Sequence, residues 1–322
     1  MSSDSIDQLR ARARSGDLSA LTTLGKCTLV GEGIRQSPQE GIALIRDAAA
    51  RGNADANALL AVFAAWAVLQ PRNIEAALDH LARAAQLGGE LAQRELRLLA
   101  RAGGDDWAAL RRKVDVTALT TPPAMRVAVE RPRIVVIDHF ASTEECDWLI
   151  ERGRPELRRA RVYHGSEQLE TADERTNSEA DFTVFRADIT LSLIRERMAV
   201  ATRAPTSHFE ITKLLHYRGD EHFGLHADFL ELNTPELVRE VEARGQRAMT
   251  LLVYLNEGYE GGETEFPKVG FRYKGARGGA MFFTNIDGAG APDYSTVHAG
   301  LPPSSGEKWL LSQWIRTRPV TG

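Results

Sequence analysis

The chain has 322 residues, which is enough for two ordinary domains, and its hydrophobic fraction of 43% can form real cores. A formal net charge of −4 argues against an extended basic surface, so neither nucleic acid nor a charged membrane is an expected partner. The two cysteines, Cys27 and Cys146, are too few and too far apart for a disulfide framework. We therefore expect free thiols in a cytoplasmic protein.

The N-terminal segment, residues 1–103, is predicted to form helical repeats. It begins MSSDSIDQLRARARSGD, which lacks the apolar core of a secretory signal, and its longest apolar run is too short to cross a bilayer. Gly16, Gly52 and Gly88 are spaced 36 residues apart, and each is expected to end a helix in the left-handed conformation. The same interval separates Ala20, Ala56 and Ala92, and also Leu24, Leu60 and Leu96.

Within one period, GIALIRDAAARGNADANALLA is typical of a helix, a turn and a second helix. The period and its glycine and alanine pattern resemble SEL-one-like repeats, which are relatives of the tetratricopeptide family. This resemblance implies a short solenoid of stacked helices. Two roles stay open: the repeats either hold a protein target or cover apolar surface of the second domain.

Residues 104–131 are predicted to be a linker. The stretch DDWAALRRKV is a candidate for one more helix, whereas TALTTPPAM has the threonine and proline content of a connecting segment. A chain that starts near Val127 is expected to fold if the repeats recruit a target, and to aggregate if they cover apolar surface.

Residues 132–322 have the pattern of a β-rich domain, so the predicted fold class is α+β, a helical solenoid followed by a barrel or double-sheet jelly roll. Candidate helices are STEECDWLIER, with Thr143 as its cap, and ITLSLIRERMAVAT, and ELNTPELVREVEARGQR is interpreted as a helical insertion. The candidate strands, rich in β-branched and aromatic residues, are RIVVI, ITKLLHY, AMTLLVYL, AMFFT and WLLSQWI.

The stretch FGLHADF places His226 and Asp228 two positions apart. In an extended segment these side chains point to the same face, so they can contribute half of a metal site. His298 is the best candidate for the missing ligand, at the end of a short strand-like run. Two histidines and one carboxylate form the facial triad of non-haem Fe(II) oxygenases. His222 lies an even number of positions before His226, so in an extended segment it would point to the same face. It is expected to line the cavity without binding the metal.

Five stretches resemble the prolyl 4-hydroxylase branch of the Fe(II)/2-oxoglutarate-dependent dioxygenases. They occur in order over roughly residues 132–318: IVVIDHFASTEECDWLI, LLHYRGDEHFGLHADF, TLLVYLNEGYEGGETEFP, GGAMFFTN and STVHAGLPPSSGEKWLLSQWIR. The resemblance implies a double-stranded β-helix that uses Fe(II), 2-oxoglutarate and O2, with ascorbate as a further cofactor that the family allows.

The resemblance also implies roles for individual residues. His226, Asp228 and His298 match the iron ligands of the family. Lys308, ten residues after His298, matches the basic residue that pairs with the distal carboxylate of 2-oxoglutarate. Tyr217 matches a tyrosine that hydrogen-bonds this cosubstrate.

Weaker candidates lie around the same pocket. Thr264 and Tyr254 are placed with the cosubstrate, although packing in the sheet would explain them as well. Arg175 matches an arginine near the mouth of prolyl hydroxylases, and Trp314 matches a substrate-facing tryptophan. The polar stretch 161–181 is a candidate lid over the site.

Three functions remain open at this stage. The first is a 2-oxoglutarate-dependent hydroxylase of a prolyl or other residue in a peptide or protein, releasing succinate and CO2. The second is a hydroxylase of a free amino acid or another small metabolite. The third is a catalytically silent protein-binding module, which the complete triad disfavours. The sequence does not fix the oligomeric state.

Overall fold

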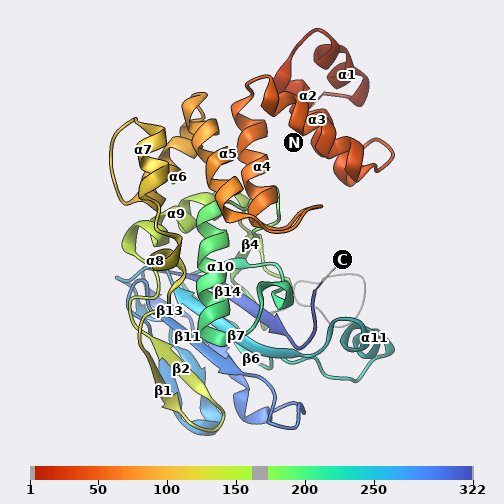
Figure 1. Ribbon diagram of the computed structural model, residues 1–322. Coiled ribbons are helices and arrows are strands. Elements are labelled where there is room, and N and C mark those ends of the chain that lie inside the picture. Colours follow the sequence, from red (N-terminus) through yellow and green to blue (C-terminus); the bar gives the residue numbers. More distant parts are fainter. Residues whose placement is uncertain (1–3, 162–172, 321–322) are drawn as a thin grey trace. The chain divides into compact units, whose positions relative to one another are not determined.

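The computed structural model describes residues 4–161 and 173–320, and these form two compact units (Figure 1). Unit 1 comprises Met1–Leu119 together with Ala187–Leu193. Unit 2 comprises Thr120–Arg186 and Ile194–Gly322. Unit 1 is helical and unit 2 is built on antiparallel sheets, which confirms the predicted fold class.

Tight turns join α1 to α2, α3 to α4 and α5 to α6, at the glycines that the repeat pattern singles out. Gly16, Gly52 and Gly88 have φ angles of 95°, 94° and 89°, in the left-handed region that glycine adopts without a steric cost. The repeated alanines and leucines are all buried. The helices are α1 (Ile6–Arg14), α2 (Leu18–Val30), α3 (Pro38–Ala50), α4 (Ala54–Ala65), α5 (Ile74–Gln86), α6 (Glu90–Ala100), α7 (Trp107–Lys113) and α8 (Val116–Thr120).

The core of unit 1 includes residues from outside the repeats. Leu110 on α7 and Leu119 on α8 pack with Leu78 and Leu96, so the first part of the predicted linker 104–131 belongs to this core. Its last part forms strand β1 (Met125–Val129). The first residues of helix α10 (Ile189–Thr202) also belong to unit 1. The hydrophobic core of the repeats is therefore completed by residues of α10, which is distant in the sequence.

Deletion of residues 1–119 is expected to make the remaining chain aggregate. Ile189 and Leu193 are 0% and 1% exposed within the core of unit 1, and the deletion would leave both in water. Each such side chain corresponds to about 1.5–3 kcal/mol of lost burial. The deletion also removes Glu95, whose Oε1 accepts hydrogen bonds from the Thr190 N–H at 2.8 Å and the Thr190 hydroxyl at 3.2 Å. Soluble yield and thermal unfolding of the truncated and full-length proteins provide the measurement.

The control is the same truncation carrying Ile189→Ser and Leu193→Ser, which we expect to be more soluble. A truncated chain that unfolds cooperatively at the melting temperature of the full-length sheet domain would contradict this prediction. Such a result would favour a recruiting role for the repeats.

Unit 2 holds an eight-stranded sheet, a four-stranded sheet and a two-stranded ribbon. Their strand orders are β1-β2-β11-β7-β14-β5-β4-β3, β10-β9-β12-β6 and β13-β8. Every pairing is antiparallel, and Figure 1 shows the central strands of the large sheet side by side. The strands after β1 are β2 (Ile134–Ile137), β3 (Arg158–Arg159), β4 (Ser178–Asp181), β5 (Lys213–Arg218), β6 (Phe223–His226), β7 (Arg247–Tyr254), β8 (Glu260–Gly261), β9 (Thr264–Phe266), β10 (Phe271–Tyr273), β11 (Ala280–Thr284), β12 (His298–Gly300), β13 (Pro303–Ser305) and β14 (Glu307–Arg316).

The core of unit 2 lies between the two larger sheets. Leu252 of β7, Met281 of β11 and Leu310 of β14 pack in one cluster with Phe266 of β9. Successive residues of a strand point to opposite faces, so alternate positions of β14, from Lys308 to Trp314, line one cavity. The two sheets thus form a sandwich with a polar-lined interior at one end.

Helices α9 (Thr143–Gly153) and α11 (Pro235–Arg244) complete unit 2. Helix α9 confirms the predicted helix, but Ser142 and not Thr143 is its cap. The Ser142 hydroxyl accepts a hydrogen bond from the Glu145 N–H, and the Glu145 carboxylate accepts one from the Ser142 N–H. Helix α11 confirms that the stretch before β7 is helical.

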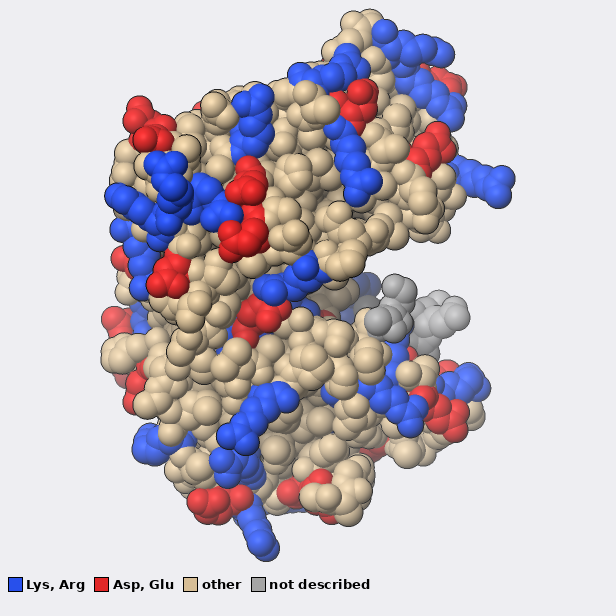
Figure 2. Space-filling view, viewed as in Figure 1, with Lys and Arg blue, Asp and Glu red and all other residues tan. Residues whose placement is uncertain are grey.

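The mixed surface charge and the free cysteines agree with what the composition predicts. The face drawn in Figure 2 carries acidic and basic side chains interspersed among large uncharged areas. Both cysteines are free thiols. None of the helices in residues 4–161 and 173–320 combines the length and the apolar character needed to cross a bilayer.

Candidate functional site

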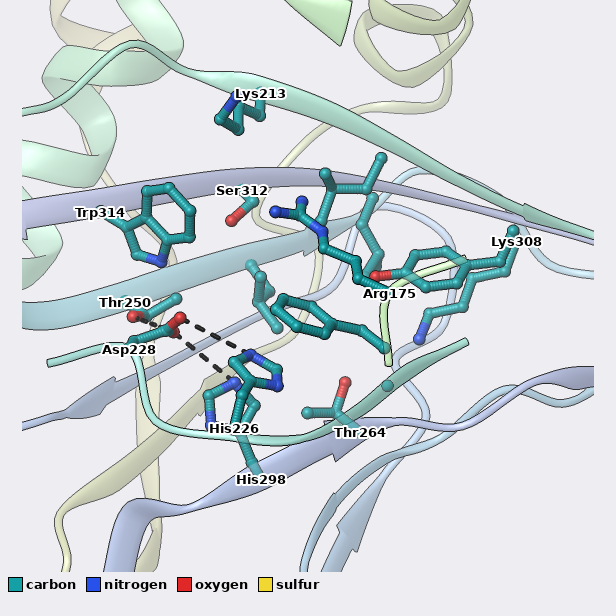
Figure 3. A pocket seen from close by; sticks show the side chains of 16 residues that line it. Arg175, Lys213, His226, Asp228, Thr250, Thr264, His298, Lys308, Ser312 and Trp314 are labelled. Atoms are coloured by element: carbon teal, nitrogen blue, oxygen red, sulfur yellow. Dashed lines mark hydrogen bonds and ion pairs between the residues drawn. The ribbon is translucent and has the colours of Figure 1, made fainter. Parts of the chain in front are cut away.

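His226, Asp228 and His298 meet at one end of the sandwich. Their ligand atoms all lie within 4.8 Å of one another, which is close enough to share one metal ion. The Asp228 Oδ1 is 3.7 Å from Nε2 of His226, and its Oδ2 is 3.6 Å from Nε2 of His298 (Figure 3). Asp228 and His298 are each 4% exposed, whereas the His226 side chain is partly exposed.

Strand pairing brings the two histidines together. His226 is the last residue of β6, and His298 stands directly opposite it on the antiparallel partner β12. Opposite residues of such strands have neighbouring side chains on one face of the sheet. The expectation that His298 ends a strand is wrong, because it begins β12. Asp228 lies two residues beyond the end of β6 and turns back toward the same point.

Backbone contacts select the imidazole nitrogen that can bind a metal. The Nδ1 of His226 is 2.8 Å from the Gly224 carbonyl, and the Nδ1 of His298 is 2.9 Å from the Thr296 carbonyl. A carbonyl can only accept a hydrogen bond, so Nδ1 carries the hydrogen in both rings. Both Nε2 atoms are left with a free lone pair that points into the cluster, which is the arrangement of a metal-binding histidine.

Protonation states agree with a metal-binding role. Burial, with a smaller contribution from His298, lowers the pKa of His226 to about 3, so this imidazole is neutral at pH 7. Burial by itself would raise the pKa of Asp228, but His298, His226 and the Thr250 hydrogen bond together lower it. Metal ligands must be deprotonated, and both side chains are.

A stack of side chains supports the His226 ring. The Phe223 ring lies parallel to it, with a centroid distance of 3.4 Å and an interplanar angle of 7°. The Arg175 guanidinium is 4.6 Å from the Phe223 ring centroid. Arg175 is buried and also pairs with Glu179 at 2.9 Å. Arg175 lines the inner cavity and its charge is neutralised by a neighbour, while its role in substrate binding stays a prediction.

Lys308 lies at the opposite end of the pocket from Asp228 (Figure 3). It is 0% exposed, and within the described residues its Nζ has no hydrogen-bond partner. Its nearest aromatic neighbour is the Tyr217 ring, at 4.9 Å. A buried ammonium without a partner is costly, so this position suits an anionic ligand. The orphaned cation and the histidine–carboxylate cluster together fit 2-oxoglutarate and a divalent metal.

The other predicted cosubstrate residues differ in placement. Tyr217 and Thr264 line an inner cavity of about 30 Å³ that contains the histidine–carboxylate cluster and Lys308. Burial raises the pKa of Tyr217 to about 12, so its phenol stays protonated and can donate a hydrogen bond. Tyr254 is hydrogen-bonded to Thr264, with 2.9 Å between the hydroxyl oxygens, and it is not among the described residues that line the cavity.

A wider opening, the outer groove, adjoins the inner cavity and has a volume of about 890 Å³. Trp314 lines both, and the Arg247 guanidinium lies 3.7 Å from its ring centroid. Part of the candidate lid, 162–172, lies outside the described residues. The rest of that stretch includes Arg175 and strand β4, which line or flank the groove.

The affinity for 2-oxoglutarate is expected to fall as the pH rises above 7. Burial lowers the pKa of Lys308 to about 7, so at higher pH the free protein must take up a proton to bind the distal carboxylate. The dissociation constant should be flat below pH 7 and increase about tenfold per pH unit above it. Calorimetric titration with Mn(II) in place of Fe(II), between about pH 6 and 8.5, measures this.

Lys308→Met, which is uncharged at every pH, is the matched control and should bind weakly with no such slope. A wild-type dissociation constant that stays flat to the upper limit would show that Lys308 is not the group that sets the affinity.

Comparison with known proteins agrees with this geometry. The model of the 2OG-Fe(II) oxygenase superfamily matches residues 212–316, which include the histidine–carboxylate cluster and Lys308. Prolyl 4-hydroxylase 1 of Arabidopsis thaliana is 32% identical over 205 residues, covering 59% of this chain and 71% of that protein. The chain belongs to the prolyl 4-hydroxylase family of 2OG-Fe(II) oxygenases.

Other known proteins are also similar to parts of the chain. The prolyl 4-hydroxylase subunit alpha-1 of Gallus gallus is 31% identical over 190 residues, which is 59% of this chain and 36% of that subunit. A viral collagen prolyl hydroxylase from Paramecium Bursaria Chlorella virus-1, solved with 2OG, is 26% identical with a TM-score of 0.44, covering 56% of this chain and 94% of that one. A Sel1 repeat protein from Oxalobacter formigenes is 27% identical with a TM-score of 0.28, covering 33% of this chain and 84% of that one.

Two residues of this prolyl 4-hydroxylase-like site were not found from the sequence. Thr250 on β7 donates a hydrogen bond to Asp228, and Asn285, just after β11, donates one to Thr250. The inward face of β7 was a usable signal for Thr250, because Leu252 and Tyr254 alternate with it on the same side. Asn285 follows the strand AMFFT, and no local pattern marks it.

Proposed function

We propose that the protein hydroxylates prolyl residues in a peptide or protein and consumes 2-oxoglutarate and O2, releasing succinate and CO2. The observation that carries the proposal is the combination of a histidine–carboxylate cluster, a buried lysine at the far end of the inner cavity whose Nζ has no hydrogen-bond partner among the described residues, and a wide groove beside them. Family membership supports the same reaction class.

The residues divide into three tasks. His226 and His298 would hold Fe(II) through Nε2, and Asp228 would hold it through a carboxylate oxygen. When bound, the iron would supply O2 activation coupled to oxidative decarboxylation of 2-oxoglutarate. Lys308 would anchor the distal carboxylate of the cosubstrate with its positive charge. The Tyr217 phenol, which stays protonated, would donate a hydrogen bond inside the same cavity.

The size of the outer groove favours a peptide over a free amino acid. A volume of about 890 Å³ lies near the top of the range of about 300–1,000 Å³ for pockets that enclose whole drug-sized ligands. A single amino acid would leave most of this space filled with water. Phe229, Leu230 and Trp314 give the groove apolar and aromatic surface that a proline-containing segment can cover.

Charges along the groove are arranged in pairs. Arg247 pairs with Glu210 at 2.7 Å, and Arg316 pairs with Glu240 at 2.8 Å. On the other side, Lys213 pairs with Asp181 at 2.6 Å. A groove whose ion pairs neutralise one another gives little attraction to a strongly charged ligand. These pairs therefore favour an uncharged stretch of polypeptide as substrate.

The test offers Fe(II), 2-oxoglutarate and O2 with three substrates: uncharged proline-containing peptides, the same peptides with alanine in place of proline, and free proline. Mass spectrometry should find one added oxygen atom on a proline of the first set, with succinate formed in equal amount. Preferred oxidation of free proline would instead support the small-metabolite hydroxylase.

A further inference from the structure

A line of three buried side chains runs from the large sheet to the carboxylate of the cluster. The Thr250 hydroxyl, on β7, is 2.6 Å from Oδ2 of Asp228. Asn285 directly follows strand β11, which pairs with β7, and its side-chain Nδ2 is 3.0 Å from the same Thr250 hydroxyl oxygen. Thr250 is 1% exposed and Asn285 is 0% exposed, so water does not compete for these bonds.

The direction of each hydrogen bond in this line is fixed. The ionised carboxylate of Asp228 can only accept, so the Thr250 hydroxyl must donate its single hydrogen to it. The Thr250 oxygen is then an acceptor, and Asn285 must present its NH2 group to it. In the described part of the chain, the Asn285 carbonyl oxygen Oδ1 has no partner, which agrees with this orientation. Asn285 thus holds Thr250 in the rotamer that points its hydrogen at Asp228.

Asn285 is also tied to a second member of the cluster through the backbone. Its carbonyl accepts from the Asp293 N–H at 3.0 Å, and the Asp293 carbonyl accepts from the Thr296 N–H at 3.0 Å. The Thr296 carbonyl in turn accepts from Nδ1 of His298 at 2.9 Å. One buried residue therefore lies at the start of two chains of contacts, one ending at Asp228 and the other at His298.

We infer that Thr250 and Asn285 are positioning residues that keep Asp228 a single-oxygen metal ligand. The Thr250 bond engages Oδ2, whereas Oδ1, on the His226 side, accepts no hydrogen bond from the described residues. Without that bond the carboxylate could rotate and offer both oxygens to the metal. It would then occupy a position that the cosubstrate or O2 needs. This inference rests on the proposed metal site.

Metal titration of the full-length protein tests the inference without relying on turnover. Mn(II) affinity is measured for the wild type, Thr250→Val, Thr250→Ser and Asn285→Leu, and Co(II) absorption spectra report the number of ligands. Thr250→Val keeps the side-chain shape and removes the hydroxyl, so we expect Mn(II) binding to weaken about 10- to 100-fold. Added 2-oxoglutarate should change the Co(II) spectrum of Thr250→Val less than that of the wild type, because the second carboxylate oxygen would occupy a position that the cosubstrate needs. Thr250→Ser restores a donor and should return both properties toward wild type.

Thr202→Val is the matched control. Thr202 is also buried, but its hydroxyl donates to the Met198 carbonyl of its own helix at 2.8 Å, so the loss should leave Mn(II) affinity unchanged. Asn285→Leu provides an independent reading, because it removes the donor to Thr250 and leaves Thr250 and Asp228 in place. Circular dichroism confirms that each variant is folded.

Failure of the positioning role and failure of the proposed metal site would give different results. Wild-type Mn(II) affinity and an unaltered Co(II) spectrum in folded Thr250→Val or Asn285→Leu would overturn the positioning role. Failure of the wild-type protein itself to bind Mn(II) would instead overturn the proposed metal site.

Discussion

His226→Ala is expected to abolish divalent metal binding and 2-oxoglutarate turnover. The Nε2 of His226 is one of three ligand atoms in the cluster, and its lone pair is directed inward by the hydrogen bond from Nδ1 to the Gly224 carbonyl. Loss of a group that merely supports a ligand costs about 10- to 100-fold in metal affinity, so loss of the ligand itself should cost at least about 100-fold. Asp228→Ala should be equally severe. Metal content after dialysis and succinate formation are the two measurements.

His222→Ala is the matched control for this experiment. His222 is four residues earlier and was expected to line the cavity, but it is not among the described residues that do so. Its Nδ1 faces the Thr176 hydroxyl at 3.3 Å and the Asp220 carbonyl at 3.1 Å. Its replacement should therefore leave metal content unchanged. Native rates of 2-oxoglutarate decarboxylation in His226→Ala would show that the metal site has been assigned to the wrong residues.

Lys308→Ala is expected to raise the Michaelis constant for 2-oxoglutarate by roughly 100-fold or more, while metal affinity changes little. Removing one partner of a buried charge pair costs about 3–5 kcal/mol, which corresponds to at least two powers of ten in affinity. The Lys308 Nζ lies away from the cluster, at the opposite end of the inner cavity (Figure 3). Steady-state kinetics against 2-oxoglutarate, with Mn(II) titration alongside, measures both quantities.

A change in the Michaelis constant for 2-oxoglutarate without a change in Mn(II) affinity would identify Lys308 as a cosubstrate-binding residue. A purely structural lysine would affect the stability of the fold and metal binding together, because it packs against Tyr217 in the core of unit 2. An unchanged Michaelis constant would mean that another basic residue holds the distal carboxylate. Arg175 would then be the next candidate, since it lines the same cavity.

The residues of the cluster could be predicted because their signals are local or have a fixed spacing. His226 and Asp228 are two positions apart, and Lys308 follows His298 at the spacing of the family. Strands β2, β5, β7, β11 and β14 were predictable as well, because their β-branched and aromatic runs are bounded by turn residues. Among the assignments that the structure corrected, Ser142 and not Thr143 caps helix α9, His298 begins its strand, and the first part of the segment 104–131 belongs to the core of unit 1.

Long-range contacts were not predictable. Thr250 is 22 residues from Asp228, and Asn285 is 35 residues from Thr250, so their hydrogen bonds depend on which strands become neighbours. Strand order in a sheet with many crossovers is not encoded in any single segment. For the same reason the sequence did not show that helix α10 is shared between the two units. Its residues Ile189 and Leu193 complete a core formed mostly by the first 119 residues.

Fe(II)-dependent release of succinate from 2-oxoglutarate by the purified protein is the most direct measurement of the central claim. The protein is first freed of metal with a chelator and then titrated with Fe(II) in the presence of 2-oxoglutarate, O2 and a proline-containing peptide. We expect no succinate from the metal-free protein, and activity that rises to saturation at about one Fe(II) per chain, the capacity of a single three-ligand cluster. Succinate formation that does not depend on added Fe(II), or its complete absence in the Fe(II)-loaded protein, would contradict the account.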